Sequence, residues 1–528
     1  MIETMRSSRG AVSAPHHLAA QAGLRVLREG GNAIEAMVAT AATIAVVYPH
    51  MNALGGDNFW LIKKSGKIIG IDACGRTAKK INREFYLKRG FSSIPPRGAL
   101  SALTVAGAPS GWDLALQISA KIDGSLPLSR LLEDATFYAG VGVPVTRSLQ
   151  KNIINKSNEL ADVPGFSETF LPGGKPPIIG ERFALSALAE TLAQISERGI
   201  SDFYEGELSR KIISDLATAG SPLRLEDMEK HRARVVEPLK ATTSFGTLYN
   251  MPPPTQGIAS LMILSLFDLF KRPEAETADY IHAIIEATKA AFNIRDKYVA
   301  DPDYMDVAVS KFLSHESLTQ MASEIDFSHA KPWNAQVDSG DTVWMGAADC
   351  DGCVVSCIQS IYWEFGSGLV LPETGIVWQN RGIGFSLEQN HHNSLEPMRQ
   401  PFHTIQPALA KLCDGRTMAY GTMGGEGQPQ TQAAILSRYV AYKQDLQSAI
   451  NAPRWLLGRT WGDDTSILRL ESRFGSDVAD DLRQRGHKLE LVSDFDDIMG
   501  HAGAVVLRPD GIYEAASDPR SDGAAVGF

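Results

Sequence analysis

Thr342 is the residue of this sequence with the clearest chemical potential. It follows Ser339-Gly340-Asp341 and opens a strand-like run that ends at Asp349. If the chain breaks between Asp341 and Thr342, the threonine becomes an N-terminal residue. Its hydroxyl and its α-amine can then act as nucleophile and general base on one residue. The pattern favours a self-processing amide hydrolase in which Asp341 and Thr342 flank the cleaved bond.

The turn after this run predicts what lies opposite Thr342. We interpret Cys350-Asp351-Gly352 as a three-residue hairpin loop whose glycine is left-handed. Asp349 then pairs with Cys353, and Ser360 lies opposite Thr342 with the β-carbons roughly 5 Å apart. A two-residue loop would send the two hydroxyls to opposite faces. The longer loop is our prediction, because it lets Ser360 support the nucleophile.

The elements that must position these residues belong to one α+β unit. The sequence predicts helices over residues 17–27, 32–47, 258–270 and about 281–292, the second opened by an Asn32/Glu35 capping box. It predicts a hairpin over residues 59–71 and strands near residues 375–378, 417–422 and 502–507. Helices dominate before Thr342 and strands after it, with no linker between two composition regimes. This indicates one interwoven domain.

Composition and charge narrow the class of protein. The chain has 528 residues, of which 44% are hydrophobic and 21% charged, as is typical of a soluble globular protein. A net charge of -10 argues against nucleic acid and anionic membranes as partners. The first residues lack the apolar core of a secretory signal, and the apolar run 36–48 is too short to span a bilayer. The five cysteines imply no disulfide framework, so we expect a cytoplasmic protein.

The sequence contains no convincing pattern for a metal or an organic cofactor. The three cysteines between residues 350 and 357 lack a fourth ligand, and the first two flank the predicted turn. His391 and His392 are adjacent and would point to opposite sides of a strand, so a solvated loop is the simpler interpretation. The glycines between residues 421 and 427 lack the lysine of a phosphate loop. We expect no metal and no cofactor.

Taken together, the motifs resemble the γ-glutamyltransferase family of N-terminal-nucleophile (Ntn) hydrolases over nearly the whole chain. The segments that carry the resemblance are His17-Leu-Ala-Ala-Gln-Ala-Gly, Gly30-Gly-Asn-Ala, Leu54-Gly-Gly-Asp, Met251-Pro-Pro-Pro, Ala300-Asp-Pro-Asp-Tyr, Phe365-Gly-Ser-Gly, Gly424-Gly and Ala452-Pro-Arg, in this order around Asp341-Thr342.

The resemblance implies a four-layer αββα sandwich and cleavage into segments 1–341 and 342–528. These two segments would stay together as a heterodimer, with a higher oligomer left open. It also implies that Thr342 is the nucleophile, that Ser360 stands in the place of a supporting hydroxyl residue, and that Gly424-Gly425 form the oxyanion loop.

Several positions depart from the transferases of that family. Tyr362 replaces an asparagine, Arg381 and Gly384 replace the groups that hold a glutamyl α-amine, and His403-Thr404 replace paired serines. Arg381 would repel an amine, whereas its planar fork matches a carboxylate. Tyr362 fills space. The pocket should therefore prefer a small anionic amide without an amino group.

Within the family, this pattern looks like the branch that hydrolyses oxamate to oxalate and ammonia in purine catabolism. Arg381 would bind the substrate carboxylate, with Asn380, His403 or Thr404 assisting it. Two other functions stay open. One is a γ-glutamyl hydrolase or transferase, or a dicarboxylic acyl-amide acylase. The other is an uncleaved, non-catalytic binding paralogue.

Simpler interpretations also stay open for single residues. Thr342 could be an ordinary strand residue, and Gly424-Gly425 could be a plain turn. Arg381 could be a salt-bridge partner, and His403 could be a buried histidine whose hydrogen bonds are satisfied.

Overall fold

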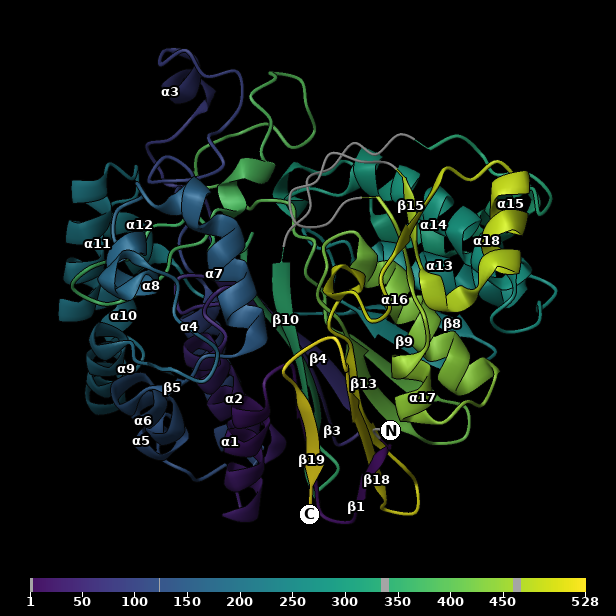
Figure 1. Ribbon diagram of the computed structural model, residues 1–528, viewed down its shortest axis with the longest axis horizontal. Coiled ribbons are helices and arrows are strands. Elements are labelled where there is room, and N and C mark those ends of the chain that lie inside the picture. Colours follow the sequence, from purple (N-terminus) through teal and green to yellow (C-terminus); the bar gives the residue numbers. More distant parts are fainter. Residues whose placement is uncertain (1–2, 123, 334–340, 459–466) are drawn as a thin grey trace.

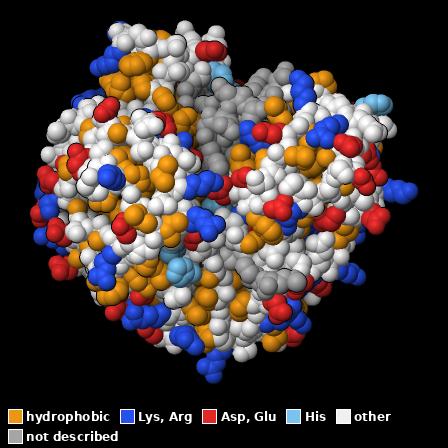
Figure 2. All heavy atoms as spheres, in the orientation of Figure 1, with side chains coloured by type: hydrophobic (Ala, Val, Ile, Leu, Met, Phe, Trp, Pro, Cys, Tyr) orange, Lys and Arg blue, Asp and Glu red, His pale blue; other side chains and the backbone are white. Residues whose placement is uncertain are grey.

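The computed structural model describes residues 3–122, 124–333, 341–458 and 467–528. These residues form two seven-stranded sheets that face each other, and a layer of helices covers the outer side of each sheet (Figure 1). This arrangement is the predicted four-layer αββα sandwich. On the face shown in Figure 2, lysine and arginine side chains alternate with aspartate and glutamate side chains, so the side chains coloured there form no continuous cationic surface.

The sheet that carries Thr342 has the strand order β19-β2-β10-β11-β3-β4-β7. Its strands are β19 (Ala524–Gly527), β2 (Ala11–Ala14), β10 (Asp341–Ala348), β11 (Val354–Tyr362), β3 (Asp57–Lys64), β4 (Lys67–Ala73) and β7 (Arg234–Val236). β10 lies in the middle of the sheet, between β2 and β11. Thr342 is therefore near the N-terminal end of a central strand.

The second sheet has the order β1-β18-β17-β13-β12-β9-β8. Its strands are β1 (Met5–Ser7), β18 (Tyr513–Ser517), β17 (Gly503–Leu507), β13 (Thr417–Gly421), β12 (Ala408–Leu412), β9 (Gly246–Asn250) and β8 (Leu239–Thr243). Smaller sheets contain β14 (Trp455–Leu457), β15 (Leu468–Glu471) and β16 (Leu489–Val492), and β5 (Val143–Pro144) with β6 (Arg182–Phe183). Both large sheets combine strands from before and after residue 342.

Two groups of helices form the outer layers (Figure 1). The Thr342 sheet is covered by α1 (His17–Arg28), α2 (Ala33–Val47) and α4 (Ala108–Ser119), and the second sheet by α13 (Gly257–Leu269), α14 (Ala278–Tyr298) and α16 (Gly427–Leu436). The other α-helices are α3 (Arg83–Leu87), α5 (Leu128–Leu131), α6 (Glu133–Val141), α7 (Arg147–Leu160), α8 (Phe166–Phe170), α9 (Ser186–Arg198), α10 (Asp202–Glu205), α11 (Glu207–Ala219), α12 (Leu225–Lys230), α15 (His315–Ser323), α17 (Leu446–Asn451) and α18 (Ser476–Gln484).

Helix α2 has a capped N-terminus and is buried along its whole length. It begins with the predicted capping box: Glu35 N–H donates to Asn32 Oδ1, and Asn32 N–H donates to the Glu35 carboxylate. All of its residues are buried, because it packs between the sheet and other helices and is apolar on every side. Among the described helices, none has both the length and the apolarity to cross a bilayer.

The hairpin of β10 and β11 has the predicted register. Pairing runs from Val343 with Gln359 to Ala348 with Val354. Asp349 N–H donates to Cys353 O at 3.1 Å, and Gly352 has φ of 75°. The predicted strand near residues 375–378 is wrong, because this segment makes only isolated bridges and no continuous ladder.

A bulge changes the pairing at Thr342 itself. Asp341 pairs with Tyr362, so one residue of β10 stands opposite two residues of β11, Ser360 and Ile361. Such a bulge bends the strand and re-aims the side chains beside it. Thr342 therefore faces both Ser360 and Ile361, and not Ser360 alone as predicted.

Asp349 ties this hairpin to α2. Its Oδ1 accepts N–H groups from Asp351 at 3.1 Å and Cys353 at 2.9 Å, and its Oδ2 accepts the N–H of Ala33 at 2.8 Å. The carboxylate thus links the turn behind the nucleophile strand to the first residue of the helix that covers it.

We expect Asp349→Ala to lower the free energy of unfolding by about 2–4 kcal/mol, because three backbone donors lose their acceptor. Urea denaturation followed by circular dichroism measures this change. Asp351→Ala, at the exposed tip of the same turn, is the matched control and should change stability by less than about 0.5 kcal/mol. Equal losses in both variants would contradict this role of Asp349.

Candidate active site

Trp344 shows which part of the second sheet faces the start of β10. Its indole packs against Gly421 at the end of β13 and Gly503 at the start of β17. A β-carbon on Gly421 would lie 2.2 Å from Trp344 Cδ1, so only glycine lets the sheets approach this closely. The indole N–H donates to Ser356 Oγ at 2.9 Å, which orients the ring.

The same packing locates Thr342. Gly346, two residues further along β10, lies against Val505, whose strand partner is Ala419. Moving from residue 346 to residue 344 of β10 therefore follows β13 from residue 419 to residue 421. Since alternate residues share one face of a strand, we infer from the next step in this direction that Thr342 lies toward the loop that contains Gly424-Gly425.

Gly424 and Gly425 connect β13 to α16. Their φ values are 110° and 49°, in the left-handed region that favours glycine. Neither glycine N–H donates a hydrogen bond to another described residue. Two such N–H groups beside a nucleophile are the donors that stabilise a developing oxyanion.

A buried polar network holds this loop. Gln256 Nε2 donates to Gly425 O at 2.9 Å and to Thr404 O at 2.6 Å. Arg295 donates from Nη1 to Gln256 Oε1 at 3.0 Å and from Nη2 to Glu426 Oε1 at 2.6 Å. The sequence pattern did not single out Gln256 or Arg295, although Gln256 directly follows the Met251-Pro-Pro-Pro-Thr segment.

The Thr342 side chain is fully buried, and its Oγ1 has no hydrogen-bond partner among the described residues. Ser360 lies across the bulge and accepts the N–H of Tyr362 at 2.8 Å. Arg381 Nη2 also approaches Ser360 Oγ at 3.4 Å. A hydroxyl that has no partner inside a protein is costly unless it serves a ligand or a reaction.

Tyr362 and Arg381 form a stacked pair next to these hydroxyls. The Arg381 guanidinium lies 3.9 Å from the centre of the Tyr362 ring. Tyr362 has φ of 83°, which strains a non-glycine residue and typically costs about 1–3 kcal/mol. The bulge and this strained residue together aim the ring at the guanidinium.

Arg381 lacks a carboxylate partner among the described residues. Its Nη1 donates to Thr404 Oγ1 at 3.4 Å, its Nη2 donates to Ser360 Oγ at the same distance, and its Nε has no partner. Burial lowers the pKa of Arg381, but a guanidinium stays protonated at neutral pH. The site thus contains a buried cation whose protein contacts are neutral hydroxyls and an aromatic ring.

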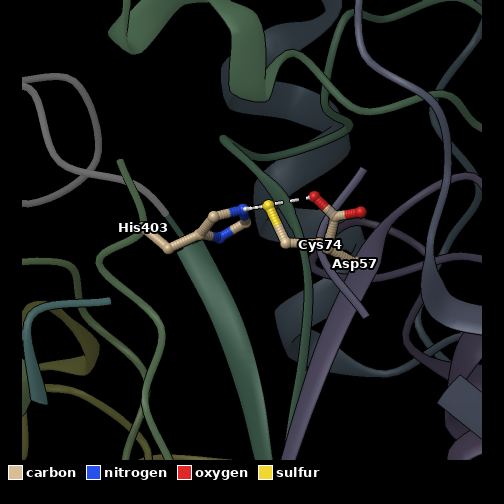
Figure 3. A group of neighbouring side chains, drawn as sticks. All are labelled: Asp57, Cys74 and His403. Carbon is tan, nitrogen blue, oxygen red and sulfur yellow. Dashed lines mark hydrogen bonds and ion pairs between the residues drawn. The ribbon is translucent and has the colours of Figure 1, made fainter. Parts of the chain in front are cut away.

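His403 belongs to a second cluster, with Asp57 and Cys74 (Figure 3). Its Nε2 lies 2.9 Å from Cys74 Sγ and 3.4 Å from Asp57 Oδ2, and its Nδ1 has no partner among the described residues. Burial, followed by the charge of Arg381, lowers the pKa of His403 to about 4. The imidazole is therefore neutral at pH 7. Sequence reasoning quoted Asp57 only as the end of the Leu54-Gly-Gly-Asp segment and assigned no role to Cys74, because both lie far from His403 in the chain.

Asn380 differs from the other predicted binding residues. Its Oδ1 accepts the N–H of Trp363 at 3.2 Å, and its Nδ2 donates to Pro96 O at 3.0 Å. Both ends of the amide are thus bound to the backbone, so this side chain holds the loop that carries Arg381. Gly384 lines a cavity of about 260 Å³ together with Tyr362 and Phe402.

Comparison with known proteins identifies the family of this chain. The family model described as Gamma-glutamyltranspeptidase matches residues 19–528. The oxamate amidohydrolase proenzyme of Klebsiella pneumoniae is 52% identical over 524 residues, 99% of each chain. The glutathione hydrolase-like YwrD proenzyme of Bacillus subtilis is 41% identical over 523 residues, 98% of each chain. The crystal structure of cephalosporin acylase from Bacillus halodurans gives a TM-score of 0.92 at 34% identity, covering 100% of this chain and 97% of that chain. The chain therefore belongs to the gamma-glutamyltranspeptidase family of Ntn hydrolases and is an amide-bond hydrolase.

Proposed function

We propose that the chain cleaves itself between Asp341 and Thr342 and then hydrolyses oxamate. The burial of Arg381 is the observation that supports an anionic substrate. A fully buried cation is costly without an anionic partner. Asp57 acts on Arg381 through its charge, but no described carboxylate forms an ion pair with the guanidinium, so a substrate carboxylate would complete the site.

The position of Arg381 also favours a short substrate. Its Nη2 lies 3.4 Å from Ser360 Oγ, and Ser360 stands across the bulge from Thr342. In oxamate the carboxylate is bonded directly to the amide carbonyl carbon, so the anion and the reacting carbon must bind close together. A γ-glutamyl group separates its α-carboxylate from the amide by three carbons. The spacing fits the two-carbon substrate better, and the 52% identical relative named for oxamate agrees with this choice.

Maturation begins when Thr342 Oγ1 attacks the carbonyl carbon of Asp341. The C–N bond breaks as the acyl group moves from nitrogen to oxygen, and water hydrolyses the resulting ester. This step leaves a carboxylate on Asp341 and a free α-amine on Thr342. Because Thr342 has no exposed surface in the intact chain, cleavage must precede substrate binding.

In turnover, the free α-amine takes the proton of the Thr342 hydroxyl, and the oxygen attacks the oxamate amide carbon. The N–H groups of Gly424 and Gly425 stabilise the oxyanion, a contribution of about 3–4 kcal/mol for each donor in comparable sites. The leaving nitrogen takes the proton and departs as ammonia. Water then hydrolyses the oxalyl ester to oxalate and restores the threonine.

A substrate panel with ammonia detection tests this function. Matured enzyme should hydrolyse oxamate with a kcat/KM at least about 100-fold higher than that for succinamate or glutaramate, since mismatched spacing breaks the Arg381 contact. It should release little p-nitroaniline from a γ-glutamyl anilide. Preference for the anilide would overturn the proposal. A chain that stays single and inactive would favour a non-catalytic binding paralogue.

One observation favours a second candidate, an acylase for longer dicarboxylic acyl groups. The cavity of about 260 Å³ beside Tyr362 has room for a longer chain, and one of the matching solved structures is a cephalosporin acylase. Tyr362 stands between this cavity and Arg381. Glutaramate hydrolysis that exceeds oxamate hydrolysis in the same panel would favour this function.

We expect Gln256→Leu to lower kcat for oxamate by about 10- to 100-fold with little change in KM. The variant keeps the side-chain size but removes both donors that hold Thr404 O and Gly425 O, so the oxyanion donors shift. Steady-state kinetics on matured protein measures the split. Gln117→Leu, an exposed glutamine, is the control. A rise in KM with unchanged kcat would assign Gln256 to binding instead.

A further inference from the structure

Asp57, Cys74 and His403 come from three distant parts of the chain and meet in one buried cluster. Asp57 begins β3, Cys74 directly follows β4, and His403 lies in the loop before β12. Their ligand atoms all lie within 4.8 Å of one another, and all three residues are buried. Figure 3 shows the thiol, the imidazole and one carboxylate oxygen directed toward a common point.

The Asp57 carboxylate is anchored by hydrogen-bond donors on one side and faces His403 on the other. Its Oδ1 accepts the N–H groups of Gly75 and Gly107, both at 3.0 Å, and Nε2 of Gln379 at 3.2 Å. Its Oδ2 faces the cluster, 3.4 Å from His403 Nε2, and has no closer hydrogen-bond partner among the described residues. Metal-ligating carboxylates are oriented in this way, with one oxygen held by outer donors and the other free for the ion.

We propose that these three side chains bind a thiophilic divalent cation such as Zn²⁺, which inhibits the enzyme and is not its cofactor. Nitrogen, sulfur and oxygen donors together match zinc. Mg²⁺ and Ca²⁺ prefer oxygen donors alone. On binding, the Cys74 S–H bond breaks, a sulfur–zinc bond forms and the proton passes to solvent. The thiolate and the carboxylate then neutralise the two charges of the ion.

The distances require only local adjustment. Sγ and Nε2, now 2.9 Å apart, must separate by some tenths of an ångström to take one ion at about 2.3 Å and 2.0 Å. Arg381 opposes a cation here, because its charge acts on both Cys74 and Asp57. The two anionic ligands have to offset that repulsion, and for this reason loss of either one should be severe.

A cavity of about 100 Å³ connects Cys74 to the surface. Its walls include Cys74, Asp72 and Gln400, and also the exposed residues Lys230 and Arg232. An ion can therefore reach the thiol through this cavity, past the cationic side chains of Lys230 and Arg232. A bound ion would shift His403. The next residue, Thr404, contacts Arg381, so the shift would disturb the proposed substrate-binding group. The inhibitory effect rests on the proposed function, but the binding itself does not.

Cobalt titration of the full-length protein tests the site. Co²⁺ added to wild type should produce a thiolate-to-cobalt charge-transfer absorption at one equivalent, and calorimetry should give Zn²⁺ binding with no heat from Mg²⁺. Cys74→Ser should remove the absorption and weaken Zn²⁺ binding by more than about 100-fold, since even lost outer partners cost 10- to 100-fold. Asp57→Asn keeps the side-chain shape and should also weaken binding.

Cys413→Ser removes an exposed thiol outside the cluster and should leave the titration unchanged. Thermal unfolding of each variant checks that it is folded. A wild type without the absorption, or a Cys74→Ser variant that retains it, overturns the site. Zn²⁺ should also inhibit oxamate hydrolysis by wild type, reversibly with EDTA. Unchanged turnover in zinc-loaded protein removes the inhibitory part of the proposal.

Discussion

The Thr342→Ala variant is expected to remain a single 528-residue polypeptide and to lose amide hydrolysis by at least about 10⁴-fold. The substitution removes the oxygen that attacks both the Asp341 carbonyl and the substrate. Wild type should instead yield fragments of residues 1–341 and 342–528. Denaturing gels and intact mass measure the cleavage, and ammonia release measures turnover.

Two controls separate chemistry from folding. Thr342→Ser keeps a hydroxyl at the same position and should still cleave and turn over. Thr417→Ala alters a buried threonine at the start of β13 and should mature normally. If Thr342→Ala yields the two fragments, or if uncleaved wild type is fully active, the Ntn mechanism is wrong for this chain.

Arg381→Met should lower kcat/KM for oxamate by about 10²- to 10³-fold. Two charge-assisted hydrogen bonds to the carboxylate would be lost, each worth roughly 1.5–3 kcal/mol. Hydrolysis of oxamide, the neutral diamide of the same length, should change far less. The ratio of the two rates therefore isolates the carboxylate contact from any general damage to the site.

The matched control for this experiment is Arg399→Met. Arg399 is also buried, but it donates to Ser394 O and lies 4.1 Å from the centre of the Tyr304 ring. Oxamate and oxamide rates should stay in their wild-type ratio in that variant. An equal fall for both substrates in Arg381→Met would make Arg381 a structural residue.

Local sequence was sufficient wherever neighbours in the chain decide the conformation. The turn Cys350-Asp351-Gly352 set the register of β10 and β11, because one left-handed glycine selects the loop. The capping box of α2 was equally local. The prediction of a strand near residues 375–378 was wrong. An apolar segment forms a strand only when a neighbouring strand pairs with it continuously, and this segment makes only isolated bridges.

The sequence predicted some residues of the site but not its local backbone geometry. Thr342, Ser360 and Arg381 were named from the chain, and the structure places them together. Their catalytic and binding functions stay predictions. The bulge at Thr342 and the strained φ of Tyr362 were not foreseen, since both depend on how two strands meet at the end of a sheet. Asn380 was expected near the substrate, but its amide is bound to the backbone.

By itself, the sequence determined the family through the order of its motifs, and the resemblance to that family implied the four layers and predicted Thr342 as the nucleophile. Patterns that repeat every two or 3.6 residues predicted individual strands and helices. Only the tertiary structure shows that no carboxylate among the described residues forms an ion pair with Arg381. It also brings Asp57 and Cys74 into contact with His403. Gln256 and Arg295 likewise reach the glycine loop only in the fold. Such contacts join residues tens to hundreds of positions apart. Their energies depend on burial and direction, which no local pattern encodes.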